Sequence, residues 1–69
     1  MKKQMEEMVK LFEEGYEVVI GSYYGDDVAE DVSEIVEVFE EVEEEPYLYL
    51  KIDVDDDLKK VEIFIGNDE

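Results

Sequence analysis

The stretch from Asp26 to Glu45, DDVAEDVSEIVEVFEEVEEE, constrains the fold more than any other part of the chain. Its apolar residues recur at steps of four and three, the spacing that aligns side chains along one stripe of an α-helix. They are Val28, Val32, Ile35, Phe39 and Val42. Eleven of the 20 residues are Asp or Glu, and none is basic. The pattern predicts a long helix with one apolar face to bury and one purely anionic face to expose.

This anionic face has a charge density close to that of a nucleic acid. At a rise of about 1.5 Å per residue, the predicted helix is roughly 30 Å long and carries about one negative charge per 2.7 Å. Duplex DNA carries one charge per ~1.7 Å of its axis. The helix therefore suggests a surface that can replace a phosphate backbone in a binding site.

The composition narrows the partners further. Twenty-three acidic residues against six lysines, and no arginine, give a formal net charge of −17. Direct binding to nucleic acid or to an anionic membrane needs cationic side chains, so we expect neither. The partners favoured by this charge are basic: a nucleic-acid-binding protein, or metal cations.

Several classes of site are excluded by missing residue types. The chain has no Cys and no His, which removes disulfides, the usual zinc sites, thiol catalysis and imidazole acid–base chemistry. We expect a cytoplasmic protein, located in the host cytoplasm if it comes from a phage. No apolar run is long enough to cross a membrane, and no leader peptide is recognisable.

The remaining segments predict a second helix and three strands. Methionines and Phe12 form an apolar stripe that predicts a helix from Lys2 to Glu14, with Gly15 as its left-handed cap. β-Branched and aromatic residues from Tyr16 to Tyr23 predict a first strand. Alternating apolar residues predict two more strands, Tyr47 to Val54 after Pro46, and Lys59 to Ile65 after an Asp55–Asp57 turn.

These elements predict one small α+β domain spanning residues 1–69, with the order α-β-α-β-β. We expect a three-stranded sheet built from a parallel β-α-β unit and a C-terminal hairpin, with two helices on one face. Tyr24 to Asp27 would form the turn into the long helix, where Asp26 or Asp27 caps the free amides.

Two surfaces are candidate binding sites for a protein. The first is a ridge along the long helix, Glu30, Glu34, Glu37, Glu41 and Glu44, together with Asp26 and Asp27. A solvated face kept acidic for solubility is the alternative, but such faces normally mix signs because like charges at i and i+4 destabilise a helix.

The second candidate surface is an aromatic patch on the sheet face away from the helices, formed by Val19, Tyr23, Tyr47, Tyr49 and Phe64, with Tyr24 nearby. It would serve as a partner interface, a homodimer contact or simple cross-strand pairing.

Neither a metal site nor an active site is predicted. Asp53, Asp55 and Asp57 alternate like the first ligands of a calcium loop, but Leu58 replaces the turn glycine and Phe64 stands where the bidentate glutamate belongs. An acidic hairpin turn is the favoured interpretation, and weak cation binding stays open. Carboxylate pairs occur throughout the chain and carry no catalytic signal. We expect no enzyme activity and no cofactor.

The α-β-α-β-β order with an acidic second helix resembles the phage inhibitors of uracil-DNA glycosylase. In that family a protruding first strand enters the DNA groove of the enzyme, and an apolar hollow between sheet and second helix captures an enzyme loop. The family carries Glu-Ser-Ile in this strand, where this chain has Gly21-Ser22-Tyr23, so Ser22 matches and the key acid is absent. The resemblance implies an acidic nucleic-acid mimic from a phage or mobile element, a class that includes anti-CRISPR proteins.

The sequence thus predicts an inhibitor that blocks the basic groove of a DNA- or RNA-processing enzyme of the uracil-DNA glycosylase or CRISPR nuclease type. Tyr23, Tyr24 or the sheet aromatics would supply an apolar anchor. Two alternatives stay open: a computationally designed α/β scaffold without a natural partner, suggested by the absence of Arg, Thr, His, Cys and Trp, and a homodimeric structural protein that associates through its sheet.

Overall fold

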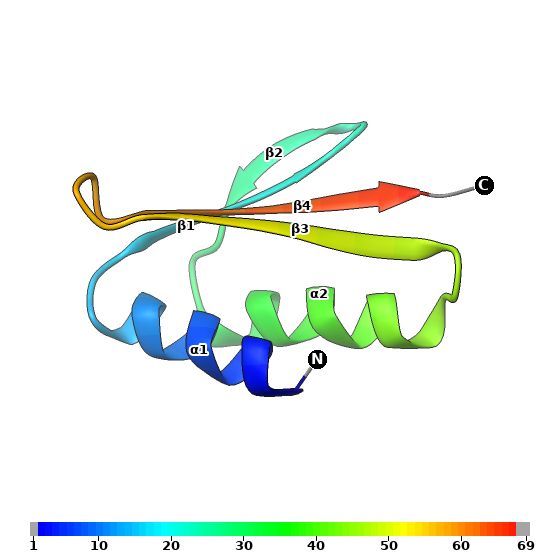
Figure 1. Ribbon diagram of the computed structural model, residues 1–69, viewed down its shortest axis with the longest axis horizontal. Coiled ribbons are helices and arrows are strands. Elements are labelled where there is room, and N and C mark those ends of the chain that lie inside the picture. Colours follow the sequence, from blue (N-terminus) through cyan, green and yellow to red (C-terminus); the bar gives the residue numbers. More distant parts are fainter. Residues whose placement is uncertain (1, 68–69) are drawn as a thin grey trace.

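Two helices cover one face of a four-stranded sheet in the computed structural model, which describes residues 2–67 (Figure 1). The small α+β class and the two helices on one face are confirmed, but the sheet has one strand more than the sequence predicted. The elements are α1 (Lys2–Glu13), β1 (Glu17–Ser22), β2 (Gly25–Val28), α2 (Val32–Glu44), β3 (Leu48–Asp55) and β4 (Lys60–Asn67).

The end of α1 agrees with the predicted glycine cap. Gly15 has a φ of 101°, a conformation that costs an L side chain energy and suits glycine. The Gly15 N–H donates to the Phe12 carbonyl at 3.1 Å, and the Tyr16 N–H donates to the Leu11 carbonyl at 3.0 Å. These bonds satisfy the last turn of the helix and direct the chain into β1.

The strand that the sequence missed is β2, which returns antiparallel along β1 after a turn at Tyr23 and Tyr24. Neither tyrosine has a positive φ, so this is not a primed hairpin turn; Gly25, at a φ of 134°, provides the reversal instead. The Tyr24 N–H also donates to the Ser22 hydroxyl at 3.2 Å. Aspartates disfavour strands, which is why the turn-and-helix prediction for Tyr24 to Asp27 was wrong.

The beginning of α2 therefore lies later than predicted. Asp31 is the N-cap, and its carboxylate accepts from the Glu34 N–H at 3.3 Å, so neither Asp26 nor Asp27 caps the helix. Val28, assigned by its spacing to the buried stripe, lies in β2 with 53% of its surface exposed. The end of α2 is as expected, since the helix stops at Glu44 just before Pro46.

The strand order β2-β1-β4-β3 also corrects the predicted β-α-β unit. β1 pairs in parallel with β4, from Glu17 opposite Lys60 to Gly21 opposite Phe64. β3 runs antiparallel to β4, so β1 and β3 run in opposite directions with β4 between them. The predicted C-terminal hairpin itself is confirmed, but its second strand, not its first, lies next to β1.

The turn of this hairpin is held by the Asp55 carboxylate, which accepts from the Asp57 and Leu58 N–H groups at 3.0 and 3.1 Å. Lys59 completes the turn with a φ of 55°. Aspartate stabilises such turns because its short side chain reaches the amides that follow it.

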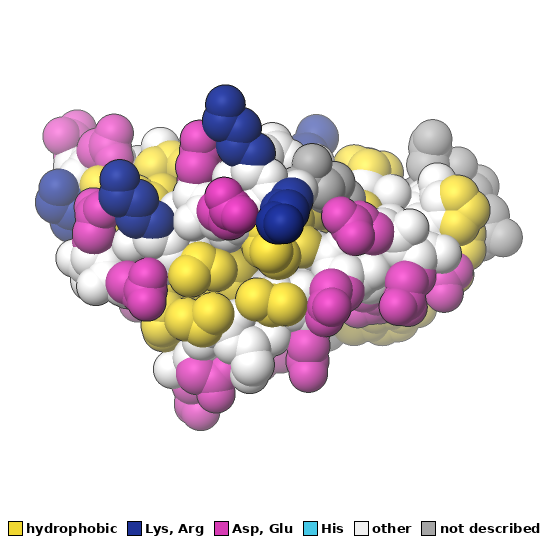
Figure 2. Space-filling model, turned by 90° about the horizontal axis from the view of Figure 1, so that it is seen from below, with side chains coloured by type: hydrophobic (Ala, Val, Ile, Leu, Met, Phe, Trp, Pro, Cys, Tyr) yellow, Lys and Arg dark blue, Asp and Glu magenta, His cyan; other side chains and the backbone are white. Residues whose placement is uncertain are grey.

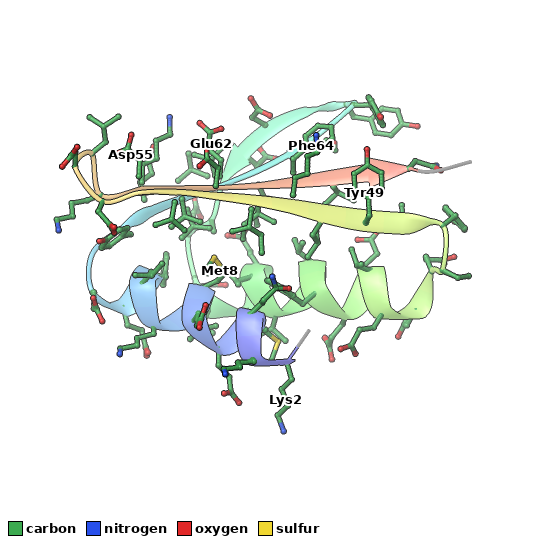
Figure 3. The ribbon with its side chains drawn as sticks, viewed as in Figure 1. Lys2, Met8, Tyr49, Asp55, Glu62 and Phe64 are labelled. Carbon is green, nitrogen blue, oxygen red and sulfur yellow. The ribbon has the colours of Figure 1, made fainter. Side chains whose placement is uncertain are left out.

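The core forms between the helices and the two central strands. Five side chains have at most 1% of their surface exposed: Val18, Ile35, Phe39, Val61 and Ile63. Met8 of α1 lies between that helix and the sheet (Figure 3). Within residues 2–67 no helix is long and apolar enough to span a bilayer.

Candidate functional site

The outer face of α2 is a dense anionic surface. This 13-residue helix holds six glutamates and no basic residue, or about one charge per 3 Å of helix. Five of them are exposed, and we call this set the α2 acidic face: Glu37, Glu40, Glu41, Glu43 and Glu44. Between residues of the 2–67 range, the one ion pair joins Lys60 and Glu62 at 3.6 Å, so no lysine there is ion-paired with the face.

Because α2 begins later than predicted, the first two glutamates of the predicted ridge, Glu30 and Glu34, do not belong to the α2 acidic face. Glu30 precedes α2, and its N–H donates to the half-buried Glu34 carboxylate. Glu34 therefore acts mainly as a capping group, beside Asp31. The Ser33 hydroxyl and the Glu34 N–H donate to Asp31 and hold its pKa below the usual value. Glu37, Glu41 and Glu44 stay on the exposed surface as predicted.

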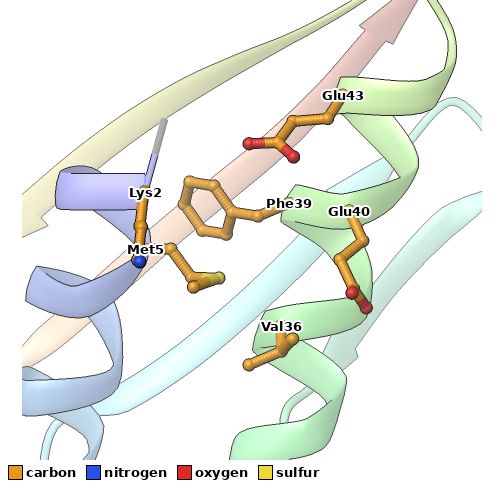
Figure 4. A pocket seen from close by; sticks show the side chains of 6 residues that line it. All are labelled: Lys2, Met5, Val36, Phe39, Glu40 and Glu43. Carbon is orange, nitrogen blue, oxygen red and sulfur yellow. The ribbon is translucent and has the colours of Figure 1, made fainter.

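Glu40 and Glu43 are the acidic positions that the ridge prediction omitted. Together with Lys2 they line a groove of about 190 Å³ between α1 and α2, whose floor is made by Met5, Val36 and Phe39 (Figure 4). Their spacing was the signal that could have identified them, because Glu40 lies three residues after Glu37 and Glu43 lies three residues after Glu40. The acidic face therefore extends from the outer side of α2 to its seam with α1.

The lysines are concentrated in two parts of the chain, and the segment between them carries only acidic charges. All six lysines lie outside residues 16–50, the range that contains β1, β2 and α2. In the view onto the helix layer, lysines gather in the upper half, whereas the charged side chains of the lower half are all acidic (Figure 2). We call residues 16–50 the lysine-free segment. Two lysines from the flanking segments lie at its borders: Lys2 lines the groove with Glu40 and Glu43, and Lys60 lines a hollow with Asp26.

An apolar hollow adjoins the α2 acidic face, at the end of the sheet where the β1–β2 turn lies near the ends of β3 and β4. It has a volume of about 300 Å³ and lies between the β1–β2 turn, the C-terminal part of α2 and one end of the β3–β4 pair. Its lining includes Tyr23, Tyr24, Glu41, Leu48 and Ile65. Tyr24 is fully exposed and Tyr23 is 69% exposed, so the rim can contact another molecule while Glu41 provides a negative charge.

The predicted aromatic patch forms on the open sheet face in part. Tyr23 and Phe64 meet edge to face, with ring centroids 5.6 Å apart. Tyr49 also projects from this face (Figure 3), and its ring covers Gly66, where an added Cβ would overlap it. Val19 lies on the same face beside Phe64, around a small hollow of about 140 Å³. Tyr47 precedes β3 and is 42% exposed.

The predicted partner-binding residues Asp26 and Asp27 lie on the edge strand β2. The Asp26 carboxylate lies across Gly21, in space that a Cβ at that position would occupy. Both aspartates are exposed, so they extend the anionic surface from α2 to this edge of the sheet.

The aspartates of the β3–β4 turn serve structural contacts. Asp55 holds the turn, and Asp56 accepts from the Tyr16 hydroxyl at 2.7 Å. This hydrogen bond is the main cause of a raised pKa at Tyr16, with burial as the second cause. Among the described residues no group of three or more acidic side chains is arranged to hold a metal ion.

Comparison with known proteins gives no relative: no family model, curated protein or solved structure matches this chain. The structure also changes what the glycosylase-inhibitor resemblance implies. β1 lies in the interior of the sheet, paired with β2 and β4, so it cannot enter a groove as a protruding strand. Ser22 instead supports the turn.

Proposed function

We propose that this chain is an acidic protein-binding inhibitor that occupies the basic groove of a nucleic-acid-processing protein. The observation that carries the proposal is the α2 acidic face, which is exposed, forms no ion pair with a lysine among residues 2–67 and belongs to the lysine-free segment. Uncompensated charges of this kind steer a cationic partner and raise the association rate.

The hollow beside Glu41 supplies the second half of the proposed site. Charge alone gives fast association, whereas burial of aromatic and apolar side chains slows dissociation. An arginine or lysine of the partner would place its aliphatic stem between Tyr24 and Leu48 and its cationic group near Glu41. The hollow thus gives the anionic surface a fixed point of attachment.

The partner class follows from the charge pattern. A groove that binds a polynucleotide presents lysines and arginines along a line, and α2 presents carboxylates along a line. Uracil-DNA glycosylase and CRISPR nucleases are the enzyme types we propose to test first, in the host cytoplasm. In this proposal the chain has no enzyme activity, binds no nucleic acid itself and needs no cofactor.

The test measures binding and inhibition with a matched pair of variants. Purified uracil-DNA glycosylase and a CRISPR nuclease are assayed first, and basic nucleic-acid-binding proteins recovered from bacterial lysate are assayed next. Glu37→Lys/Glu41→Lys should weaken binding by about a hundredfold or more, because close interfacial charge pairs are worth ~1.5 kcal/mol or more each. The control Glu13→Lys/Asp57→Lys changes the net charge equally, at exposed positions outside the lysine-free segment.

Salt provides the second measurement. Affinity should fall steeply as ionic strength rises, and the bound enzyme should be displaced by DNA. The proposal is overturned if no basic nucleic-acid-binding protein is retained, if affinity is indifferent to salt, or if the two double variants bind equally well.

A further inference from the structure

The two edges of the sheet differ in how well they are protected from pairing with another strand. β2 is four residues long, begins with Gly25 and carries Asp26 and Asp27, and a short charged edge of this kind resists further pairing. β3 is eight residues long and pairs with β4 without a bulge or a proline. Its outer edge presents a continuous row of backbone groups that no strand of the described residues pairs with.

The helix-facing side of β3 is also incompletely covered. The inward residues of the central strands, Val18, Val61 and Ile63, have at most 1% of their surface exposed. In contrast, Leu50 and Ile52 of β3 are half-buried, and Val54 is 40% exposed. A row of aliphatic side chains therefore stays open along the same edge as the unpaired backbone.

The side chains of β3 are complementary to a second copy of β3 in one antiparallel register. When Ile52 lies opposite Ile52 of the other copy, Lys51 faces Asp53 and Asp53 faces Lys51, giving two opposite-charge pairs on the open face. On the helix side, Leu50 then faces Val54. Both helix layers lie on the same face of the joined sheet, because residues that face each other belong to the same side of the pleat.

Neighbouring registers are less complementary. A shift by two residues in one direction places Lys51 opposite Lys51, and like charges directly opposite are destabilising. The shift in the other direction places Asp53 opposite Asp53; Lys51 then faces Asp55, but the Asp55 carboxylate already accepts from the Asp57 and Leu58 N–H groups of its own turn. A shift by one residue places aliphatic side chains opposite charged ones and turns the helix layers to opposite faces. The sequence of β3 therefore selects one pairing out of several.

We propose that the chain forms a symmetric homodimer through β3, with two sheets joined edge to edge into one sheet of eight strands. The two-fold axis passes between the two copies of Ile52. This contact uses the opposite edge of the sheet from β2, so it leaves the α2 acidic face and its hollow accessible, and it does not depend on the proposed function. Net repulsion between two acidic copies opposes it, so the dimer should strengthen as salt rises.

A charge swap tests the contact. Sedimentation equilibrium of the full chain at high salt should show a concentration-dependent dimer. Lys51→Asp and Asp53→Lys should each weaken dimerisation by about tenfold or more, since each turns two attractive cross-strand pairs into repulsive ones. The double variant Lys51→Asp/Asp53→Lys should restore the dimer. A chain that stays monomeric at every concentration, or a dimer unaffected by the single variants, would overturn the proposal.

Disulfide cross-linking tests the register, since the natural chain has no cysteine. Ile52→Cys places two thiols in facing positions, within the 4.4–6.8 Å Cα separation that a disulfide requires, and should cross-link on mild oxidation. Leu50→Cys is the matched control, because its two copies would lie about 13 Å apart along the strands and should stay reduced. Efficient cross-linking of the Leu50 variant with none at Ile52 contradicts the register.

Discussion

The two helices share one sheet face and have nearly the same length, but they differ in charge and in anchoring. α1 carries three lysines and three glutamates over its 12 residues, whereas α2 carries six glutamates and no lysine over its 13. α1 buries one residue, Met8, and α2 buries four. The helix with the greater electrostatic strain is thus the one held most firmly by the core, which allows a small domain to keep its charge uncompensated.

The largest expected effect tests the anchoring half of this comparison. Phe39→Ala should lower the free energy of unfolding by about 3–5 kcal/mol, because Phe39 is 1% exposed and its loss leaves a cavity between the helices. Met8→Ala should cost about 2 kcal/mol, since a methionine packs with a flexible, adaptable side chain and Met8 is less completely buried than Phe39. Urea unfolding followed by circular dichroism measures both. Equal losses would show that the two helices are anchored equally.

A smaller effect tests the difference in charge, through the same substitution on each helix. Glu41→Lys on α2 places a lysine three or four residues from Glu37, Glu44 and Glu45 and should raise the free energy of unfolding by about 0.5–1 kcal/mol. Glu6→Lys on α1 is surrounded instead by lysines at positions 2, 3 and 10 and should lower it by a similar amount. We expect the two changes in the free energy of unfolding to have opposite signs and both to become smaller as salt is added. Changes of the same sign would refute the comparison.

The smallest effect concerns the start of α2. Hydrogen bonds lower the pKa of Asp31 in the folded state, so its charged form contributes stability above the unfolded value of about 3.8, and this contribution is lost as pH falls through the folded value. Asp31→Asn keeps an oxygen acceptor but does not titrate. The melting temperature of the natural chain should exceed that of the variant at pH 7, and the difference should shrink below about pH 4. A constant difference would contradict the assignment.

Local patterns in the sequence predicted α1, its Gly15 cap, β1 and the β3–β4 hairpin, because helix periodicity, strand alternation and a capping glycine act between near neighbours. β2 escaped prediction for a physical reason. Val28 continues the four-and-three spacing of the α2 stripe, and Asp26 and Asp27 are typical of helix starts. The pairing of β1 with β4 could not be read from the chain either, since it depends on contacts between distant segments.

In the candidate site, too, the features set by near neighbours in the sequence were predicted, and those set by contacts between distant segments were not. The acidic surface follows directly from composition and periodicity, and Glu37, Glu41 and Glu44 were identified from them. The hollow could not be predicted, because it joins Tyr24, Glu41 and Ile65 from three elements whose arrangement depends on the strand order. The use of Glu34 in capping also depended on where the helix begins.

The place of β4 has a consequence for how the chain reaches its native state. This strand is the last element of the fold, yet it lies in the middle of the sheet and pairs Lys60 with Glu17, roughly forty residues earlier. Most of the chain must therefore leave the ribosome before β1 gains its central neighbour, and folding should be slow for a domain of this size. Until then the apolar stripe of α2 has no complete sheet to cover, and we expect its glutamates to oppose aggregation of the nascent polypeptide.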